Sequence, residues 1–290
     1  MRILVKRIGA LGDVILTTPV VRRLRLENPG AEIGVQTAYP DVFRNSPHKV
    51  ATLDPGNLPY PWTERGGCDR TMDLDLVYER QPRTHIVQAY MEAAFGLLNA
   101  GLPATWQQEI SYDPPAAMPK GVVAVHAART GWRNRTLPAA TWFAVTVLLR
   151  REGWFPLLVG GSHETVPEAR AASALGASLH AQVAMISRCA AFIGSDSALL
   201  HAAGATDVPI VGVFTSVRPE VRLPWRRGQL GWNCEAVMPL LECVGCHADQ
   251  PVPSTTESCA RGDLACVKTV QAEDIVAALE RLMRPQSIVK

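Results

Sequence analysis

Two short stretches of this chain place a carboxylate at the point where a strand-like segment gives way to a helix-like one. The first is Gly-Ala-Leu-Gly-Asp at residues 9–13, which ends in Asp13. The second is Gly-Ser-Asp-Ser-Ala at residues 194–198, with Asp196 at its centre. Ligands of open α/β sheets bind outside the carboxyl ends of the strands, at junctions of this kind. A carboxylate there can take a proton from a substrate or accept hydrogen bonds from a ligand.

The segments around the first junction alternate between strand and helix patterns. Apolar runs at residues 3–6, 32–37 and 50–53 predict buried strands. Residues 13–28 and 84–100 have the apolar periodicity of helices.

A second alternation begins after residues 114–119, where repeated proline interrupts both helices and sheets. Predicted strands lie at residues 122–127, 156–159, 191–194 and 209–214, and predicted helices at residues 139–151, 164–173, 182–189, 197–205 and 272–283. We therefore expect an α/β protein with two doubly wound Rossmann-like domains that face each other across a cleft. The first covers residues 1–117. The second covers residues 118–290 and includes a cysteine-rich segment at 243–266 and a closing helix.

Composition excludes several classes of protein. With 290 residues, 47% of them hydrophobic, the chain can form two domains with cores of their own. A net charge of +2 gives no electrostatic reason to expect nucleic-acid binding. The chain has no run of 18 apolar residues, and Gly12 and Asp13 interrupt the apolar N-terminus where a secretory signal needs its core. We expect a cytoplasmic protein, and peripheral contact with the inner face of the inner membrane is left open.

Several motifs, taken in order, resemble those of the ADP-heptose:lipopolysaccharide heptosyltransferases, glycosyltransferase family 9. The segment from Leu11 to Pro19 is similar to the opening of that family, and residues 194–201 resemble its donor-site Asp-Thr-Gly-x-x-His element. Residues 209–214 and the cysteine-containing residues 259–268 are similar to later family segments, and so is Gly160-Gly161-x-x-Glu164. The resemblance spans residues 1–283, with a poor match over residues 40–115.

The resemblance implies an inverting GT-B glycosyltransferase that needs no catalytic metal. It implies transfer of a heptose or related sugar from a nucleotide-sugar donor, with ADP-heptose expected. The acceptor would be a hydroxyl of a bacterial glycan, of the lipopolysaccharide core, of another lipid-linked acceptor or of a protein. The alternative is a catalytically inactive protein of the same fold that binds a sugar nucleotide or a glycan.

Asp13 is the candidate catalytic residue. It is the only carboxylate of the first glycine loop, and the resemblance implies that it deprotonates the acceptor hydroxyl. Aspartate is also favoured as the residue that caps a helix N-terminus. The two roles are compatible, so both stay open here.

The second half of the chain carries the candidate donor site. Arg135, which stands where the family usually has lysine, can hold a diphosphate bidentately. Asp196 suits sugar hydroxyls, Ser197 can donate to phosphate, and Glu164 can take ribose hydroxyls. The full predicted set is Gly12, Arg129, Thr130, Arg135, Glu164, Asp196, Ser197, Ala198 and His201, where Ser197-Ala198 replaces the Thr-Gly of the family. The alternatives are a core histidine for His201, a first-turn position for Glu164 and a solvated basic loop around Arg129 and Arg133.

Four of the seven cysteines form a candidate metal site. Cys243, Cys246, Cys259 and Cys266 have the ligand count of a tetrahedral four-thiolate zinc or iron site. Such a site would be structural, because four thiolates leave no open coordination position. Free or packed thiols are the alternative.

A stretch with four arginines follows the last predicted strand of the second domain. Trp225 lies among Arg218, Arg222, Arg226 and Arg227. It could contact a phosphorylated acceptor, a membrane surface or nucleic acid, or it could be a solvated loop. The near-neutral net charge argues against a nucleic-acid module built on the four cysteines, so we expect no nucleic-acid partner.

Overall fold

The computed structural model describes residues 1–62, 67–97, 103–113, 117–128, 132–166, 170–249 and 259–284. Its N-terminal part contains a four-stranded parallel sheet in the order β3-β2-β1-β4. The strands are β1 (Arg2–Lys6), β2 (Glu32–Gln36), β3 (Ala51–Leu53) and β4 (Arg70–Asp73). The central residues of β1 are buried, as expected for a parallel strand between two neighbours.

The predicted helix at residues 13–28 is instead two helices. These are α1 (Leu11–Ile15) and α2 (Thr18–Glu27), with Pro19 in the first turn of α2. Between them the hydroxyl of Thr17 donates to the Val14 carbonyl oxygen at 2.7 Å. Proline fits the first turn of a helix but cannot continue one, which explains why a new helix begins here.

The third helix of this part, α3 (Ile86–Phe95), ends earlier than predicted. It stops at Gly96, whose φ of +85° is incompatible with a continuing helix. Within the described residues of the N-terminal half, the 3-10 turns are η1 (Pro40–Phe43), η2 (Tyr60–Trp62) and η4 (Pro103–Thr105).

The second sheet has six parallel strands in the order β12-β9-β8-β5-β6-β7. The strands are β5 (Val122–His126), β6 (Phe155–Leu158), β7 (Ala172–Ser173), β8 (Ala191–Ser195), β9 (Ile210–Val213) and β12 (Cys234–Val237). Its helices are α4 (Ala139–Arg151), α5 (Leu179–Ile186), α6 (Ala198–Gly204) and α8 (Ala272–Met283). Further elements are α7 (Ala265–Lys268), the hairpin β10 (Trp225–Arg226) and β11 (Gln229–Leu230), and the turns η5 (Arg133–Arg135), η6 (Pro219–Val221) and η7 (Cys246–Asp249).

One prediction for this sheet is wrong. Residues 172–173 of the predicted helix 164–173 form β7, and residues 167–169 lie outside the described ranges.

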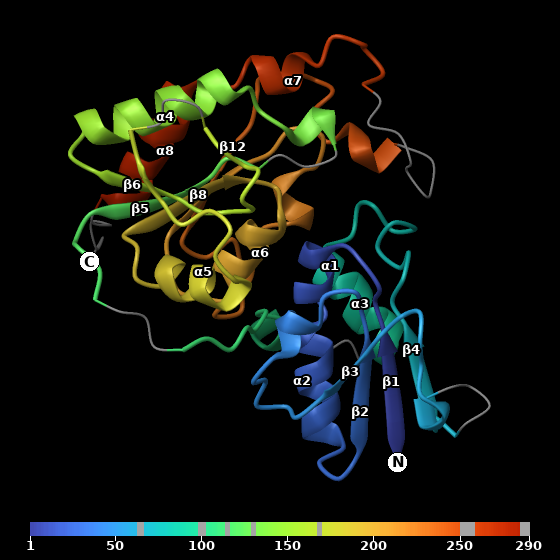
Figure 1. Ribbon diagram of the computed structural model, residues 1–290. Helices are drawn as coiled ribbons and strands as arrows, with labels where there is room; N and C mark the ends of the chain where they lie inside the picture. Colours follow the sequence, from blue (N-terminus) through green and yellow to red (C-terminus); the bar gives the residue numbers. More distant parts are fainter. Residues whose placement is uncertain are drawn as a thin grey trace, which may run out of the picture.

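Helices cover the two faces of the second sheet differently. Helices α4 and α8 pack together on one face, and α5 and α6 lie on the other (Figure 1). Residues from α5 and α6 join the apolar core of the first sheet in one continuous cluster, whereas α4 and α8 belong to a separate cluster. The face that carries α5 and α6 therefore looks toward the first sheet.

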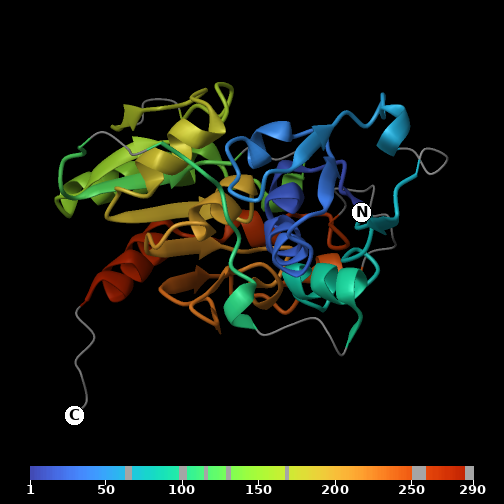
Figure 2. The same cartoon turned by 90° about the horizontal axis from the view of Figure 1, so that it is seen from below.

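Two separate parallel sheets with helices on their faces confirm the expected α/β fold class, and both views show them side by side (Figure 2). The predicted junction at residues 114–119 falls partly on residues 114–116, which lie outside the described ranges, so the boundary at residue 117 stays a prediction. Among the described residues, no helix combines the length and apolar character needed to cross a membrane.

Candidate active site

The two strand-to-helix junctions found in the sequence meet in the structure. Helix α1 packs against α6, and Gly12 is buried at the contact. A Cβ atom placed on Gly12 would lie 3.0 Å from His201 Cδ2 and 3.3 Å from Ala198 Cα. The close approach of the two backbones therefore depends on the missing side chain of Gly12.

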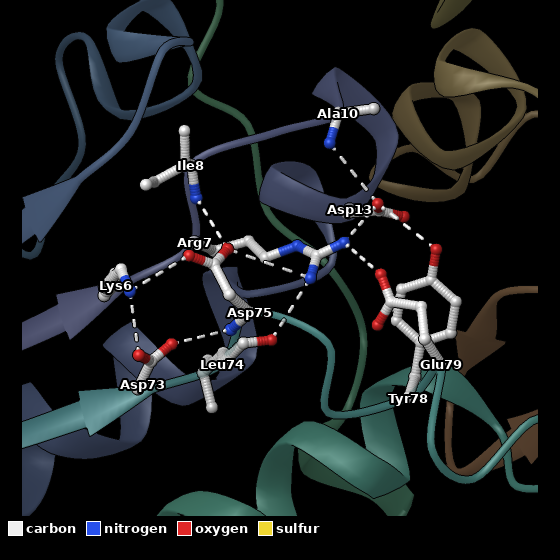
Figure 3. A network of polar contacts seen from close by, with 10 residues as sticks. All are labelled: Lys6, Arg7, Ile8, Ala10, Asp13, Asp73, Leu74, Asp75, Tyr78 and Glu79. Carbon is white, nitrogen blue, oxygen red and sulfur yellow. Dashed lines mark hydrogen bonds and ion pairs between the residues drawn. The ribbon is translucent and has the colours of Figure 1, made fainter. Parts of the chain in front are cut away.

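Asp13 is held by one of its two carboxylate oxygens (Figure 3). Arg7 Nη2 donates to Asp13 Oδ2 at 2.5 Å, and the Tyr78 hydroxyl and the Ala10 backbone N–H each donate to the same oxygen at 3.3 Å. The other oxygen, Oδ1, has no hydrogen-bond or ion-pair partner among the described residues. Asp13 thus keeps one oxygen for a ligand.

The capping role considered for Asp13 is visible in its contacts. Helix α1 begins at Leu11, so Asp13 lies in its first turn rather than before it. From that position its carboxylate accepts the N–H of Ala10, the N-terminal flanking residue, as in a capping box. Asp13 supports the helix start and still faces the second junction.

Asp196 at the end of β8 lies among cations. Its Oδ2 is 3.2 Å from Arg135 Nη1, and its Oδ1 is 3.9 Å from Arg222 Nε and 3.8 Å from His201 Nε2. Burial pushes the pKa of Asp196 upward, but Arg135 and Arg222, helped by His201 and His247, outweigh burial and hold it below its ordinary value of 3.8. The carboxylate is therefore ionised at neutral pH.

Tyr78 and Arg222 connect the two carboxylates. Tyr78, which follows β4, donates to Asp13, and the guanidinium of Arg222 lies 4.8 Å from the centre of the Tyr78 ring. Arg222 also faces Asp196. Burial, and then the charge of Asp13, raise the pKa of Tyr78, so its hydroxyl stays protonated and can donate. The two junctions thus belong to one site.

His126 links two of the predicted donor-site residues. Its Nε2 lies 3.0 Å from Glu164 Oε2 and its Nδ1 lies 2.9 Å from Ser197 Oγ. Because a carboxylate only accepts, Nε2 carries the proton and the Ser197 hydroxyl donates to Nδ1. The backbone N–H of Gly161 also donates to Glu164 Oε2, at 2.7 Å. The glycine pair thus brings Glu164 back toward the sheet.

Arg135 stacks as well as pairs. Its guanidinium lies 4.9 Å from the centre of a ring of Trp132, and that side chain also meets the His247 ring in a T-shaped contact at a centroid distance of 5.3 Å. Two further predicted residues, Arg129 and Thr130, lie outside the described residues.

His201 has features of both interpretations that the sequence left open. It is buried, and burial lowers its pKa to about 4, although the Asp196 carboxylate opposes the shift. It is therefore a neutral core histidine at pH 7 that also faces a site carboxylate.

The arginine-rich stretch is solvated only in part, because Arg218 and Arg227 are exposed. Arg222 and Arg226 are both buried. The Arg226 guanidinium donates to the carbonyl oxygens of Ala203, Gly204 and Val208 at 2.7 to 3.4 Å, which satisfies the C-terminal end of α6. Arg226 is structural, whereas Arg222 belongs to the site.

Several buried polar atoms near Asp196 have no hydrogen-bond partner among the described residues. They are Ser195 Oγ, Asp196 Oδ2, Arg135 Nε, His201 Nδ1, Ser216 Oγ and His247 Nδ1. Asp196 Oδ2 lies within ion-pair distance of Arg135 but without hydrogen-bond alignment. Because buried polar groups are nearly always hydrogen-bonded, this set suits a polar, charged ligand.

Sequence comparison decides the family. The model of glycosyltransferase family 9 (heptosyltransferase) matches residues 70–235, more than half of the chain and including the second junction. The chain belongs to this family. A comparison with curated proteins finds no match.

Solved structures show the same fold at low sequence identity. The glycosyl transferase family 9 protein of Veillonella parvula DSM 2008 is 17% identical with a TM-score of 0.70, over 97% of this chain and 96% of that one. The iron-containing dodecameric glycosyltransferase TibC of enterotoxigenic E. coli H10407 is 16% identical with a TM-score of 0.74, over 98% and 78%. The ADP-heptose lps heptosyltransferase II of E. coli is 14% identical with a TM-score of 0.66, over 97% and 98%. This family 9 member therefore has the two-domain GT-B fold.

The four cysteines of the C-terminal segment do not fit the predicted metal site. All of them are free thiols that influence one another, since burial and then the charges of the neighbouring cysteines raise the pKa of both Cys246 and Cys266. Within the part of the chain that the structure describes, no three His, Cys, Asp or Glu side chains are arranged to hold one ion. Zinc or iron at Cys243, Cys246, Cys259 and Cys266 is therefore not supported, and no step below uses a metal.

Sequence reasoning missed four residues of the site: Arg7, Tyr78, His126 and His247. Two carried a signal, because Arg7 and His126 are polar residues at the carboxyl ends of buried strands, where ligands bind. Arg222 was noted only as part of a basic stretch. Tyr78 and His247 reach the site through long-range contacts that no local sequence pattern predicts.

Proposed function

We propose that this family 9 protein is an inverting glycosyltransferase that moves a heptose or related sugar from a nucleotide sugar, with ADP-heptose expected, to an acceptor hydroxyl. The observation that supports this most is the meeting of the two junction carboxylates. Asp13 from the first sheet and Asp196 from the second share one site through Tyr78 and Arg222. A donor and an acceptor held on opposite domains need such an arrangement.

Asp13 acts as the general base in this proposal. The acceptor hydroxyl gives its proton to Asp13 Oδ1, and the oxygen lone pair forms the new bond to the anomeric carbon. The bond between that carbon and the diphosphate oxygen breaks, and the leaving diphosphate keeps the electron pair. Attack opposite the leaving group inverts the anomeric centre.

The second domain holds the donor. Arg135 and Arg222 are cations that can neutralise the diphosphate as its negative charge grows. The Ser197 hydroxyl donates to His126 rather than to phosphate, so its oxygen can instead accept a hydrogen bond from a sugar hydroxyl. The ionised Asp196 repels phosphate, so it accepts hydrogen bonds from sugar hydroxyls. Glu164 takes the ribose hydroxyls. Gly12, Ala198 and His201 form the contact between the domains beside the donor, and Arg129 and Thr130 complete the proposed set.

We propose a bacterial glycan, lipid-linked or protein acceptor. Among the structural neighbours, one is a lipopolysaccharide heptosyltransferase by its description, and lipopolysaccharide biosynthesis is the corresponding proposal for this chain. TibC has been crystallised with ADP-D-beta-D-heptose, and the E. coli heptosyltransferase WaaC with ADP-2-deoxy-2-fluoro heptose. These ligands motivate ADP-heptose as the first donor to test.

A thermal-shift comparison of ADP-heptose with UDP-, GDP- and dTDP-sugars tests the donor. A ligand at about 100 times its Kd stabilises the folded state by about 2.7 kcal/mol, so ADP-heptose should raise Tm clearly while the others leave it unchanged. A larger Tm shift with another nucleotide sugar would identify that compound as the donor in place of ADP-heptose. Tight donor binding with no transfer to any glycan would favour the inactive, sugar-nucleotide-binding alternative.

A further inference from the structure

Arg7 lies at the carboxyl end of β1 and is 3% exposed. Its Nη2 atom donates to two carboxylates, to Asp13 Oδ2 at 2.5 Å and to Glu79 Oε1 at 2.9 Å (Figure 3). Its Nη1 atom donates to the Leu74 carbonyl oxygen at 3.2 Å. One guanidinium is thus shared between the candidate base and a second carboxylate.

Aromatic rings restrict the position of Arg7. Its guanidinium carbon lies 5.3 Å from the ring centre of Tyr78 and 5.8 Å from that of Tyr90. With the backbone contact to Leu74, these rings leave the guanidinium little freedom to follow a moving partner. Asp13 is therefore held against a fixed donor through Oδ2 alone.

We propose that Arg7 and Glu79 are positioning residues for sugar transfer, which hold Asp13 by Oδ2 and allow Oδ1 to accept the proton of the acceptor hydroxyl. This inference rests on the proposed role of Asp13 as the base. The acceptor proton ends on Asp13 Oδ1, the acceptor oxygen bonds to the anomeric carbon, and the diphosphate leaves with the electron pair. Neither Arg7 nor Glu79 gains or loses a proton.

The charge count explains why Glu79 matters. Arg7, Asp13 and Glu79 together carry one net negative charge. When Asp13 takes up a proton, Arg7 and Glu79 remain as a matched ion pair. Without Glu79, the same proton would leave a buried guanidinium without a close carboxylate, because Asp75 Oδ1 lies 3.9 Å away and already accepts the Ile8 N–H. An uncompensated buried charge is strongly unfavourable, so a neutral residue at position 79 makes Asp13 a weaker base.

The environment of Glu79 agrees with this role. Its second oxygen, Oε2, is buried and has no hydrogen-bond partner among the described residues. Arg7 is therefore the main group that compensates the negative charge of Glu79. The other titratable or charged groups that act on Asp13 or Arg7 are Asp75, Tyr78, Tyr90, His201, Arg222 and His247.

Titration of the Asp13 carboxyl group tests the proposal without any substrate. In protein labelled with ¹³C at the Asp and Glu carboxyl carbons, the Asp13 resonance is identified by its loss in Asp13→Asn. We expect Glu79→Gln to lower the Asp13 pKa, with at least a tenfold increase in its acid dissociation constant. Tyr78→Phe removes a donor to Oδ2 and should shift the pKa in the opposite direction. Glu27→Gln, which removes a 2.7 Å ion pair with Arg23 away from the site, is the matched control and should leave Asp13 unchanged.

Two results distinguish this inference from the proposed function. An Asp13 titration that is the same in wild type, Glu79→Gln and Tyr78→Phe overturns the inference, whether or not the protein transfers sugar. If Glu79→Gln does not fold, Tyr78→Phe alone still tests the inference, because it should raise the Asp13 pKa. In an active enzyme, Glu79→Gln should also move the acidic limb of the kcat/KM profile to lower pH and reduce kcat. A wild type that transfers no sugar while the titrations shift as expected overturns the proposed function instead.

Discussion

Asp13 and Asp196 occupy the same place in two similar folds, yet their surroundings differ. Each follows a buried parallel strand and lies at the start of a short helix. Asp13 shares one guanidinium with another carboxylate and keeps an oxygen without a partner among the described residues. Asp196 is more deeply buried and lies among two arginines and two histidines. A common backbone motif thus places two carboxylates in different electrostatic surroundings.

The difference follows from what faces each carboxylate. Asp13 faces a guanidinium that is itself paired with a second carboxylate, since Arg7 Nη2 also donates to Glu79 Oε1. Asp196 faces two guanidinium groups that oppose protonation, so it can accept hydrogen bonds but is a poor proton acceptor. On this contrast we propose proton transfer at the first junction and donor binding at the second.

Asp13→Asn is the substitution with the largest expected effect on activity. Asp13→Asn removes the proton acceptor while an amide oxygen can still accept the Ala10 N–H, so the helix start should survive. We expect turnover to fall by about 10²- to 10⁴-fold, with donor affinity almost unchanged because the proposed donor contacts lie mainly on the second domain. Release of nucleoside diphosphate from ADP-heptose measures turnover, and calorimetry measures affinity. If the folded Asp13→Asn protein had wild-type turnover, Asp13 would act only at the helix start and would not be the base.

Asp196 should matter for stability as well as for binding. Asp196→Asn leaves the buried Arg222 and the half-buried Arg135 without their carboxylate, and breaking such a pair costs about 3–5 kcal/mol. Chemical denaturation measures the loss. Asp207→Asn, which removes an exposed pair with Arg227, is the control and should change stability by about 0–1 kcal/mol.

The stability difference between wild type and Asp196→Asn should also depend on pH, in a direction set by the pKa of Asp196. The folded-state pKa of Asp196 lies below that of an unfolded aspartate, about 3.9. The ionised carboxylate therefore stabilises the fold above about pH 4, and this contribution is lost as the pH falls through the folded-state value. The stability difference between wild type and Asp196→Asn should shrink in acid. A difference that stays constant down to pH 3 would contradict the ion-pair account.

The sequence contained most of the local information about this site and little of the long-range part. Asp13 and Asp196 were identifiable because a strand, a glycine and a helix start are adjacent in the chain. Tyr78 lies 65 positions from the carboxylate that it contacts, so only folding brings them together. The prediction of a single helix over residues 13–28 was wrong because Pro19, which cannot continue a helix, lies in the first turn of a second one.

Gly12 tests whether the two junctions must touch. A methyl group at this position would press on His201 and on the Ala198 backbone. Overpacking costs about 1–3 kcal/mol, while the higher helix propensity of alanine returns up to about 1 kcal/mol. We expect Gly12→Ala to lose about 1 kcal/mol net, with a larger proportional loss of turnover because the two carboxylates move apart. Gly30→Ala, where a methyl group meets nothing within 4 Å, is the control. Equal turnover in both variants would show that the contact tolerates displacement.

The smallest expected effect concerns Arg135, where this chain departs from the lysine usual in the family. Arg135→Lys keeps the positive charge beside Asp196 but loses the stacking on Trp132, so stability should fall by about 0.5–1 kcal/mol. Lysine also loses the forked donor geometry toward the diphosphate, a loss of about 0.5–1 kcal/mol that lowers donor affinity about two- to fivefold. Calorimetry measures this loss against Arg133→Lys on the same turn, which should leave donor affinity unchanged. A fall of more than a hundredfold would mean that the fork itself holds the diphosphate, and that arginine and lysine members of the family bind their donors differently.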